Sequence, residues 1–364
     1  EGELVARWII EKINWKKPIK RLWISSVTDR AIRDGFKQLK PGEQFENLYQ
    51  SAVCRAEADW LIGLNVSRAL TTKYKDPLSA GRVQTPTLSL IINREKQIQK
   101  FIPQKFWMIK AKCGAFDIEW EKNGEKRIFE KEKAEKIIHK LQGQKACVIG
   151  INTKEKTEQQ PLPYDLNELQ RDANKRYGFS AKKTLNVLQK LYEEHKYVTY
   201  PRTDSRYLTT DMEATMFERL TGISSAFKDE VQPILARKGK VMAKRVFNNE
   251  KVSDHHAIIP TEEKVHLNDL SSDERKIYDL IVRRFLTIFF PPFKYEIIQA
   301  QFEVNGEKFA AKARNIKDWG FKKVQDRDEE ETAHSNLDIF KKGHSYSVKD
   351  IAMEERLTEP PLRY

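Results

Sequence analysis

Hydrophobic positions divide the chain into helical and β-forming blocks that alternate along its length. Apolar residues recur every three to four positions in 48–100 and 164–290, which predicts amphipathic helices. In 105–151 and 294–313 the pattern is typical of strands, and a charged helix is expected at 131–141. We therefore expect a multidomain α+β protein in which a helical unit is inserted into a β unit.

Helix caps mark the start of the second helical block. Asp165 and Glu168 have capping-box spacing, Gly178 can end the first helix, and Ser180 suits the N-cap of the next. Two helices joined by Gly-Phe-Ser and followed by the extended run Tyr197–Tyr200 are typical of a helix-turn-helix or winged-helix unit.

The beginning of the chain has a mixed α/β pattern. Helices are expected at 4–14 and 29–39, with a short strand at 21–24. The chain starts with Glu-Gly-Glu, without an initiator Met, and ends abruptly at Tyr364. From these ends we interpret it as a fragment of a longer protein.

Charge and composition narrow the class of partner. Lys plus Arg number 66 and Asp plus Glu 53, so the net charge is +13, which favours a polyanion such as nucleic acid. No apolar run is long enough to span a membrane. Cys54, Cys113 and Cys147 show neither disulfide nor zinc-finger spacing, so we expect small buried thiols. The acidic run 326–331 is interpreted as an exposed loop.

The segment 197–205, with the sequence YVTYPRTDS, contains the strongest candidate for chemistry. Pro201 disfavours a helical conformation at Tyr200, and in an extended segment Tyr200 and Arg202 point to the same side. A guanidinium favours the phenolate and offers paired N–H donors to phosphoryl oxygens, so this pair suits attack on a phosphate. The alternative is a buried tyrosine and a surface arginine with structural roles only.

Three further segments contain residue types that bind phosphate. Ser79–Gln84 (SAGRVQ) leads into a helix whose N-terminus can hold a phosphate, although the same pattern also serves as a simple helix cap. Arg55 and Asp59 have i, i+4 spacing, which also predicts a surface ion pair. His255 and His256 have no third metal ligand nearby, so a histidine that contacts a phosphate or a carboxylate fits as well as a metal ligand.

Four ordered motifs resemble those of the type IA DNA topoisomerases: RAEADWLIG, SAGRVQTPTL, YPRTDSRYL and HHAIIPT. The first motif and the proline after the tyrosine are most similar to the bacterial topoisomerase III branch of the family. The resemblance covers essentially the whole chain. It implies a toroid with a helical domain, a β-rich arch and a CAP-like, winged-helix domain that carries the catalytic tyrosine.

The resemblance also assigns roles to single residues. Tyr200 matches the family's nucleophile, Arg202 its phosphate-stabilising arginine, and His255 its active-site histidine. Residues that match the family's contacts to single-stranded DNA are Arg55, Asp59, Arg68, Ser79, Ala80, Gly81, Arg82, Val83, Gln84 and Arg202. Glu1 matches the last carboxylate of the family's metal motif, whose two aspartates are not in the chain, so the implied Mg²⁺ site is incomplete.

The domain boundaries combine the resemblance with the pattern of the chain. The polar stretch 154–163, which ends in Pro-Leu-Pro, predicts a boundary. The implied domains are a TOPRIM remnant at 1–47, a helical DNA-binding domain at 48–102, the β-rich arch at 103–160 and 293–356, the CAP-like domain at 161–292, and the start of a return to the helical domain at 357–364.

The implied activity is an ATP-independent topoisomerase that relaxes or decatenates DNA through a 5′-phosphotyrosine intermediate. No P-loop is present, which agrees with ATP independence. The resemblance implies single-stranded DNA and a helicase as partners, no membrane, a monomer, and a cytoplasmic, nucleoid-associated location in a bacterium. We expect this fragment to be inactive alone.

Two other functions fit part of the sequence. Tyrosine recombinases also use Arg, His and Tyr, but their tyrosine follows the other residues, whereas Tyr200 precedes His255. A non-catalytic protein that binds single-stranded nucleic acid fits the charge and the helix-turn-helix pattern, but not the four ordered motifs. A covalent protein–DNA adduct separates these classes.

Overall fold

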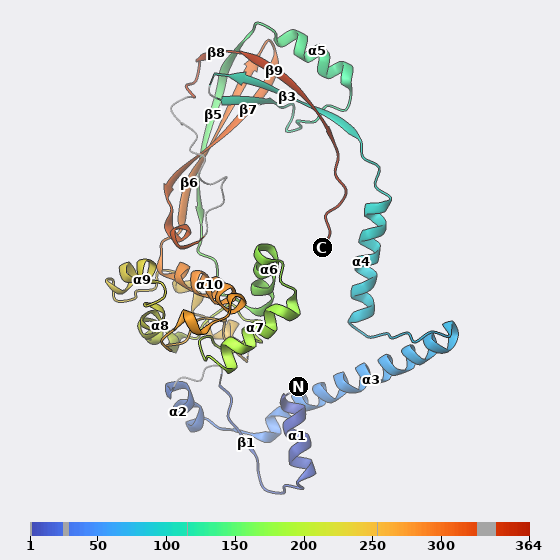
Figure 1. Cartoon of the computed structure of the whole chain (residues 1–364), viewed down its shortest axis with the longest axis vertical. Coiled ribbons are helices and arrows are strands. Elements are labelled where there is room, and N and C mark those ends of the chain that lie inside the picture. Colours follow the sequence, from blue (N-terminus) through green and yellow to red (C-terminus); the bar gives the residue numbers. More distant parts are fainter. Residues whose placement is uncertain (1, 25–28, 115, 253, 326–339) are drawn as a thin grey trace.

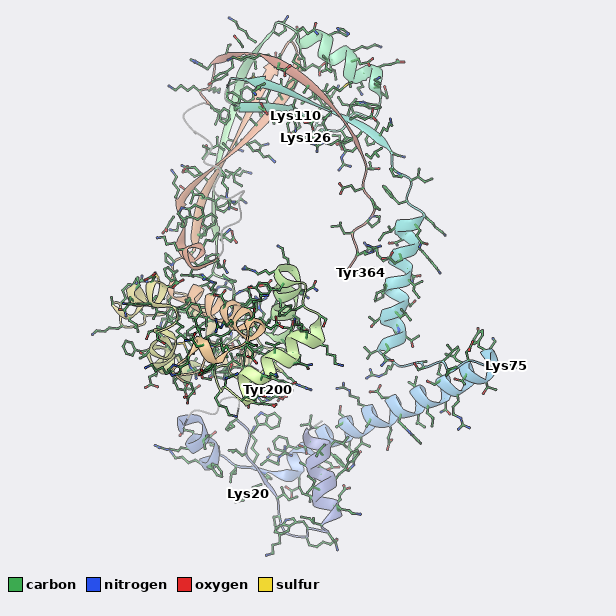
Figure 2. All side chains as sticks on the ribbon, viewed as in Figure 1. Lys20, Lys75, Lys110, Lys126, Tyr200 and Tyr364 are labelled. Atoms are coloured by element: carbon green, nitrogen blue, oxygen red, sulfur yellow. The ribbon has the colours of Figure 1, made fainter. Side chains whose placement is uncertain are left out.

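The computed structural model describes residues 2–24, 29–114, 116–252, 254–325 and 340–364. Its elements form an open ring, which remains open when the side chains are drawn (Figures 1 and 2). This is the toroidal, multidomain α+β architecture that the sequence implies. No helix in the described ranges combines the length and hydropathy needed to cross a membrane. The acidic run 326–331 lies outside the described residues.

The N-terminal part and two long helices form the base and one side of the ring (Figure 1). Its elements are α1 (Gly2–Lys12), β1 (Lys20–Arg21), α2 (Asp29–Lys37), β2 (Lys40–Pro41), the 3₁₀ helix η1 (Gly42–Phe45), α3 (Glu46–Tyr74) and α4 (Gln84–Gln99). The expected helices are confirmed, whereas the strand expected at 21–24 is only the two-residue β1, paired antiparallel with β2. Neither α3 nor α4 contains a buried residue.

A seven-stranded antiparallel sheet forms the top of the ring. Its strands are β3 (Lys105–Cys113), β4 (Phe116–Trp120), β5 (Lys145–Glu158), β6 (Phe293–Val304), β7 (Glu307–Asp318), β8 (Ser345–Ser347) and β9 (Asp350–Leu357), in the order β8-β5-β6-β7-β4-β3-β9. Helix α5 (Lys131–Leu141) has the bounds that the sequence predicts. Its residues Ala134, Ile137 and Leu141 share a hydrophobic core with Trp107 and Phe302 of the sheet.

Strand β5 extends into the polar stretch from which a boundary was predicted. It pairs with β6 from Cys147↔Glu303 to Glu158↔Phe293, with a bulge between Val148 and Gly150. The polar side chains from 152 to 158 are exposed, so this half of the strand is stabilised by its ladder rather than by a core. Because β5 enters and β6 leaves the helical block side by side, the block is an insertion in the sheet.

The helical block lies below the lower end of the sheet (Figure 1). It contains α6 (Leu166–Tyr177), α7 (Ala181–Glu193), α8 (Met216–Ile223), α9 (Lys228–Leu235) and α10 (Ser272–Leu286), with the 3₁₀ helices η2 (Thr210–Thr215), η3 (Lys244–Val246), η4 (Asn249–Lys251), η5 (Leu267–Asp269) and η6 (Thr287–Phe289). The predicted caps are confirmed: Asp165 accepts from the N–H of Glu168, Ser180 from that of Lys183, and Gly178 has φ +67°.

The extended run Tyr197–Tyr200 makes only an isolated antiparallel bridge, Val198↔Pro260. The ladder does not continue past it, because the N–H of Ile259 donates to the Thr199 hydroxyl instead of the Thr199 carbonyl. The expectation of three buried thiols is wrong for one of them. Cys113 is buried and Cys147 partly buried, but Cys54 is exposed. Cys54 lies on α3, whose side chains all remain at least partly accessible.

Gly320 fixes the return of the chain from β7 onto the helical block, and replacing it tests this packing. It begins η7 (Gly320–Val324) with φ +47°, and a Cβ atom would lie 2.4 Å from the carbonyl oxygens of Pro291 and Pro292. We expect Gly320→Ala to lower the unfolding free energy by at least about 2 kcal/mol, because strain and a backbone clash act together.

Gly306→Ala is the matched control, since Gly306 has φ +81° but open space where a Cβ would lie. It should cost only about 1 kcal/mol, from the left-handed conformation. Denaturant-induced unfolding of both variants measures the difference, and equal losses would contradict the tight approach at Gly320.

Candidate functional site

Tyr200 lies on a segment that leaves α7 and is tied to the segment 255–261. The backbone N–H of Thr199 donates to the carbonyl of Ile259 at 3.0 Å. The Thr199 hydroxyl donates to the carbonyl of Ala257 at 3.1 Å and accepts from the N–H of Ile259 at 3.0 Å. These three bonds fix the backbone immediately before Tyr200.

The residues after Tyr200 are fixed in the same way. The Thr203 hydroxyl donates to the carbonyl of His255 at 3.0 Å and accepts from the N–H of Ser205 at 3.1 Å. The Ser205 hydroxyl donates to the carbonyl of Lys251 at 2.8 Å. Hydrogen bonds before and after Tyr200 therefore hold its segment against the segment 255–261, which lies more than fifty residues later in the sequence.

The ring of Tyr200 contacts two aromatic side chains. It stacks on the imidazole of His255, with centroids 4.0 Å apart and planes at 28°. Tyr192 meets the same ring edge-on, at 5.6 Å and 89°. Figure 2 shows Tyr200 on the side of the helical block that faces the N-terminal part. The sequence motifs predict His255 but not Tyr192, which lies in α7, outside every motif.

Arg202 is exposed two residues beyond Tyr200. In the ranges that the structure describes, its guanidinium makes no salt bridge, so it is accessible to an anion. The structure therefore brings Tyr200 and His255 into contact and leaves a free cation close to them along the chain. This arrangement can bind a phosphate ester beside a phenol oxygen.

His256 has a structural role in the fold. Its Nδ1 donates to the carbonyl of Ala257 at 2.8 Å, which requires the proton on that nitrogen. Burial lowers the pKa of His256 to about 4, and the nearby charge of Arg219 acts in the same direction. The imidazole is therefore neutral near pH 7.

The described residues do not assemble a metal site. No group of three or more His, Cys, Asp or Glu side chains within them could hold a metal ion. Glu1 lies outside the described residues. Glu3, in α1, accepts hydrogen bonds from Arg7 and Arg21, so its carboxylate already has two cationic partners.

The expected nucleic-acid-binding residues other than Arg202 lie on α3 and on the segment that leads from it into α4. Asp59 forms an ion pair with Arg82, Nε to Oδ1 at 2.5 Å and Nη2 to Oδ2 at 3.3 Å, and not with Arg55 as the helical spacing predicts. Arg82 engages both carboxylate oxygens, whereas Arg55 acts on Asp59 through its charge alone. The hydrogen bonds from Arg82 hold the pKa of Asp59 below its usual value.

The backbone of the SAGRVQ segment is largely engaged within the protein. The N–H of Ala80 donates to the Ser67 hydroxyl at 2.9 Å, and the N–H of Gly81 donates to the Thr85 hydroxyl at 3.1 Å. The N-cap residue of α4, Val83, makes no side-chain cap hydrogen bond, so both the helix cap and the phosphate seat remain open for this segment. The side chains available to a ligand are the exposed ones, namely Arg55, Arg68, Ser79, Arg82, Val83 and Gln84.

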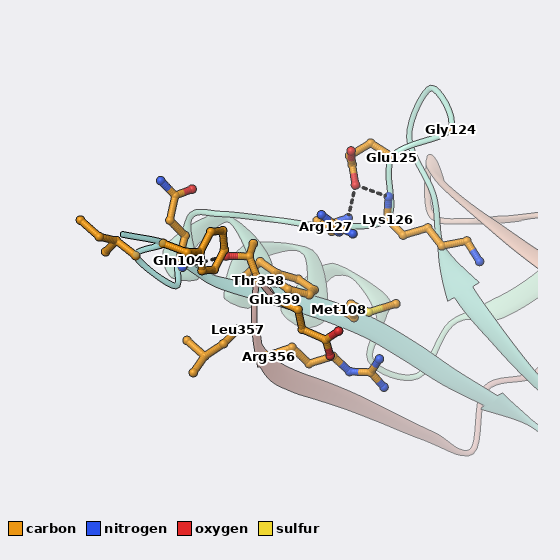
Figure 3. A pocket seen from close by; sticks show the side chains of 13 residues that line it. Gln104, Met108, Gly124, Glu125, Lys126, Arg127, Arg356, Leu357, Thr358 and Glu359 are labelled. Carbon is orange, nitrogen blue, oxygen red and sulfur yellow. Dashed lines mark hydrogen bonds between the residues drawn. The ribbon is translucent and has the colours of Figure 1, made fainter. Parts of the chain in front are cut away.

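A hollow of about 900 Å³ lies far from Tyr200, where α4 joins the sheet (Figures 2 and 3). Phe106, Met108 and Arg127 are among the residues that line it, and the Arg127 guanidinium lies 5.2 Å from the centroid of the Phe106 ring. Glu125 accepts hydrogen bonds from the N–H groups of Lys126 and Arg127 (Figure 3). No sequence motif marks this hollow.

Comparisons with known proteins agree with the motifs. "DNA topoisomerase 3" of Bacillus subtilis is 48% identical over 371 residues, and that of Bacillus licheniformis is 50% identical over 371 residues. Each match covers 100% of this chain and 51% of the relative. The chain therefore spans about half the length of these curated relatives.

A solved structure has the same fold. Full-length topoisomerase I from Thermotoga maritima superposes with a TM-score of 0.75 at 27% identity, over 100% of this chain and 59% of that one. The family model described as DNA topoisomerase matches residues 43–364. The motifs, the ring and these matches together show that the chain belongs to the type IA DNA topoisomerase family.

Proposed function

We propose that the protein is a topoisomerase of the topoisomerase 3 kind that breaks and reseals one strand of DNA with Tyr200 as its nucleophile. The observation that carries the proposal is the fixed Tyr200 segment, with the ring stacked on His255 and an exposed Arg202 two residues away. The family supplies the reaction class, and the geometry supports these residues as the ones that perform it.

In the proposed cleavage step, the phenol oxygen of Tyr200 attacks a backbone phosphorus. A bond forms between the phenol oxygen and the phosphorus at the 5′ end of the downstream strand. The bond from this phosphorus to the upstream O3′ breaks. The phenol loses its proton and the O3′ gains one. Arg202 donates hydrogen bonds to the phosphoryl oxygens as charge develops on them. Resealing reverses these steps, and because the phosphodiester energy is retained, no ATP is needed.

The base of the ring offers a binding surface for the strand before it reaches Tyr200. Arg55, Arg68 and Arg82 are exposed there. We propose that they contact the phosphates of single-stranded DNA, with Arg82 exchanging Asp59 for a phosphate. Four further parts of the proposal rest on the resemblance alone. They are magnesium with Glu1 as one ligand, a helicase partner, a monomeric state, and a cytoplasmic, nucleoid-associated location.

The first test is covalent capture of DNA by the full-length protein. We expect Tyr200→Phe to abolish the adduct while the dissociation constant for a single-stranded oligonucleotide changes less than about twofold, because ring and cations remain. Arg202→Ala should slow adduct formation by roughly two to three decades, as the loss of one donor to a developing anion does.

Oligonucleotides labelled at either end distinguish the products of this test on denaturing gels. The adduct should contain the fragment on the 3′ side of the break. Adduct from Tyr200→Phe, or linkage through a 3′ phosphate, contradicts the proposed mechanism. Binding without any adduct in the wild-type protein indicates the non-catalytic alternative.

The second test uses the 364-residue chain itself. We expect it to bind single-stranded DNA more tightly than blunt duplex, with affinity that falls steeply as salt rises, since a +13 chain binds through released counterions. We do not expect it to relax supercoiled DNA with magnesium. Fluorescence anisotropy and agarose-gel relaxation measure the two properties, and relaxation at ordinary enzyme concentration contradicts the second.

The third test concerns Arg82. Arg82→Ala should weaken binding of single-stranded DNA for all base sequences and reduce the salt slope by about one, because one phosphate contact is lost. The control Lys133→Ala removes an exposed cation from α5, away from the α3–α4 junction. Equal salt slopes for the two variants exclude Arg82 from the interface.

A further inference from the structure

The proposed nucleophile is restrained on two sides by rings from different parts of the chain. His255 covers one face of the Tyr200 ring, at 4.0 Å between centroids. Stacking of this kind sets the plane of the ring but resists sliding within that plane only weakly. Tyr192 makes a T-shaped contact with the same ring, at 5.6 Å and 89°, which adds a second restraint on its position.

Tyr192 is itself well fixed. It lies in the last turn of α7, directly after Leu191 and one turn after Leu188, and both leucines are buried in the core of the helical block. The turn after it is closed by the bond from the N–H of Tyr197 to the carbonyl of Leu191, at 2.9 Å. Tyr192 also packs against that core with part of its own surface.

The hydroxyl of Tyr192 does not hold this side chain in place. Across the described parts of the chain, its hydroxyl makes no hydrogen bond. The Lys196 ammonium lies 5.8 Å from the centroid of its ring, so the ring rather than the hydroxyl makes the visible contacts. The function of this side chain should therefore survive the loss of the hydroxyl but not the loss of the ring.

We propose that Tyr192 is a positioning residue for the cleavage step: its ring and the imidazole of His255 form an aromatic slot that holds the phenol of Tyr200 in one orientation. Tyr192 does not touch DNA in this proposal. A nucleophile that is misplaced by a fraction of an ångström attacks more slowly even when the substrate is bound equally well. The inference rests on the function proposed above and names a determinant of its rate.

The experiment compares three variants of the full-length protein in single-turnover cleavage of a labelled single-stranded oligonucleotide. Tyr192→Leu should slow formation of the adduct about tenfold, with the dissociation constant for the oligonucleotide unchanged within about twofold. Tyr192→Phe keeps the ring and should cleave at close to the wild-type rate.

Tyr177→Leu is the control for stability. Tyr177 is also partly buried against the core of the helical block, and it packs on Phe179 instead of Tyr200, with centroids 5.7 Å apart. This variant should lower the thermal midpoint as much as Tyr192→Leu does, yet cleave at the wild-type rate.

Three outcomes overturn the proposal: wild-type cleavage by Tyr192→Leu, a rate of Tyr192→Phe as slow as that of Tyr192→Leu, or a loss of affinity that accounts for the slower rate. Failure of the proposed function gives a different result, because the wild-type protein then forms no adduct at all.

Discussion

The pairing of β5 with β6 is the interaction on which the arrangement of the molecule depends. It joins residues that are 135 to 156 positions apart in sequence, from Glu158↔Phe293 to Cys147↔Glu303. Because both strands end at the same level, the entire helical block is attached to the sheet through neighbouring points. The direction of this pair of strands therefore sets where Tyr200 lies relative to the base of the ring.

The site combines two kinds of restraint. Around Tyr200 the restraints are many and partly buried, since threonine hydroxyls satisfy carbonyl groups and backbone N–H groups that have no sheet partner. At the α3–α4 junction the main contact is the exposed pair of Arg82 and Asp59, with both side chains nearly half accessible. An exposed ion pair contributes little to stability, so it can be exchanged for a ligand at small cost. The proposed nucleophile is thus preorganised, whereas the surface proposed to bind the strand can adapt.

Local signals in the sequence predict the elements well. The bounds of α5 and the caps at Asp165 and Ser180 follow from short-range rules. The motifs also predict that Tyr200 and His255 lie close together.

Long-range geometry is where sequence reasoning fails. Asp59 has a candidate partner one helical turn away at Arg55, but the fold supplies Arg82 with better geometry. Tyr192 carries no motif, and its contact with Tyr200 depends on how the chain turns after α7, where Lys196 adopts φ +58°. The polar half of β5 shows no hydrophobic alternation, because its stability comes from main-chain pairing.

That polar half of β5 has a mechanical consequence. A sheet covered by α5 resists bending because bending would open a packed core, whereas the stretch of β5 from 152 to 158 has exposed side chains on both faces. Its elastic resistance comes from the ladder and the twist of a few strands, so we expect this stretch to bend more easily than the part of the sheet that α5 covers. The helical block has its own extensive core, so bending of this stretch would move the block as one body.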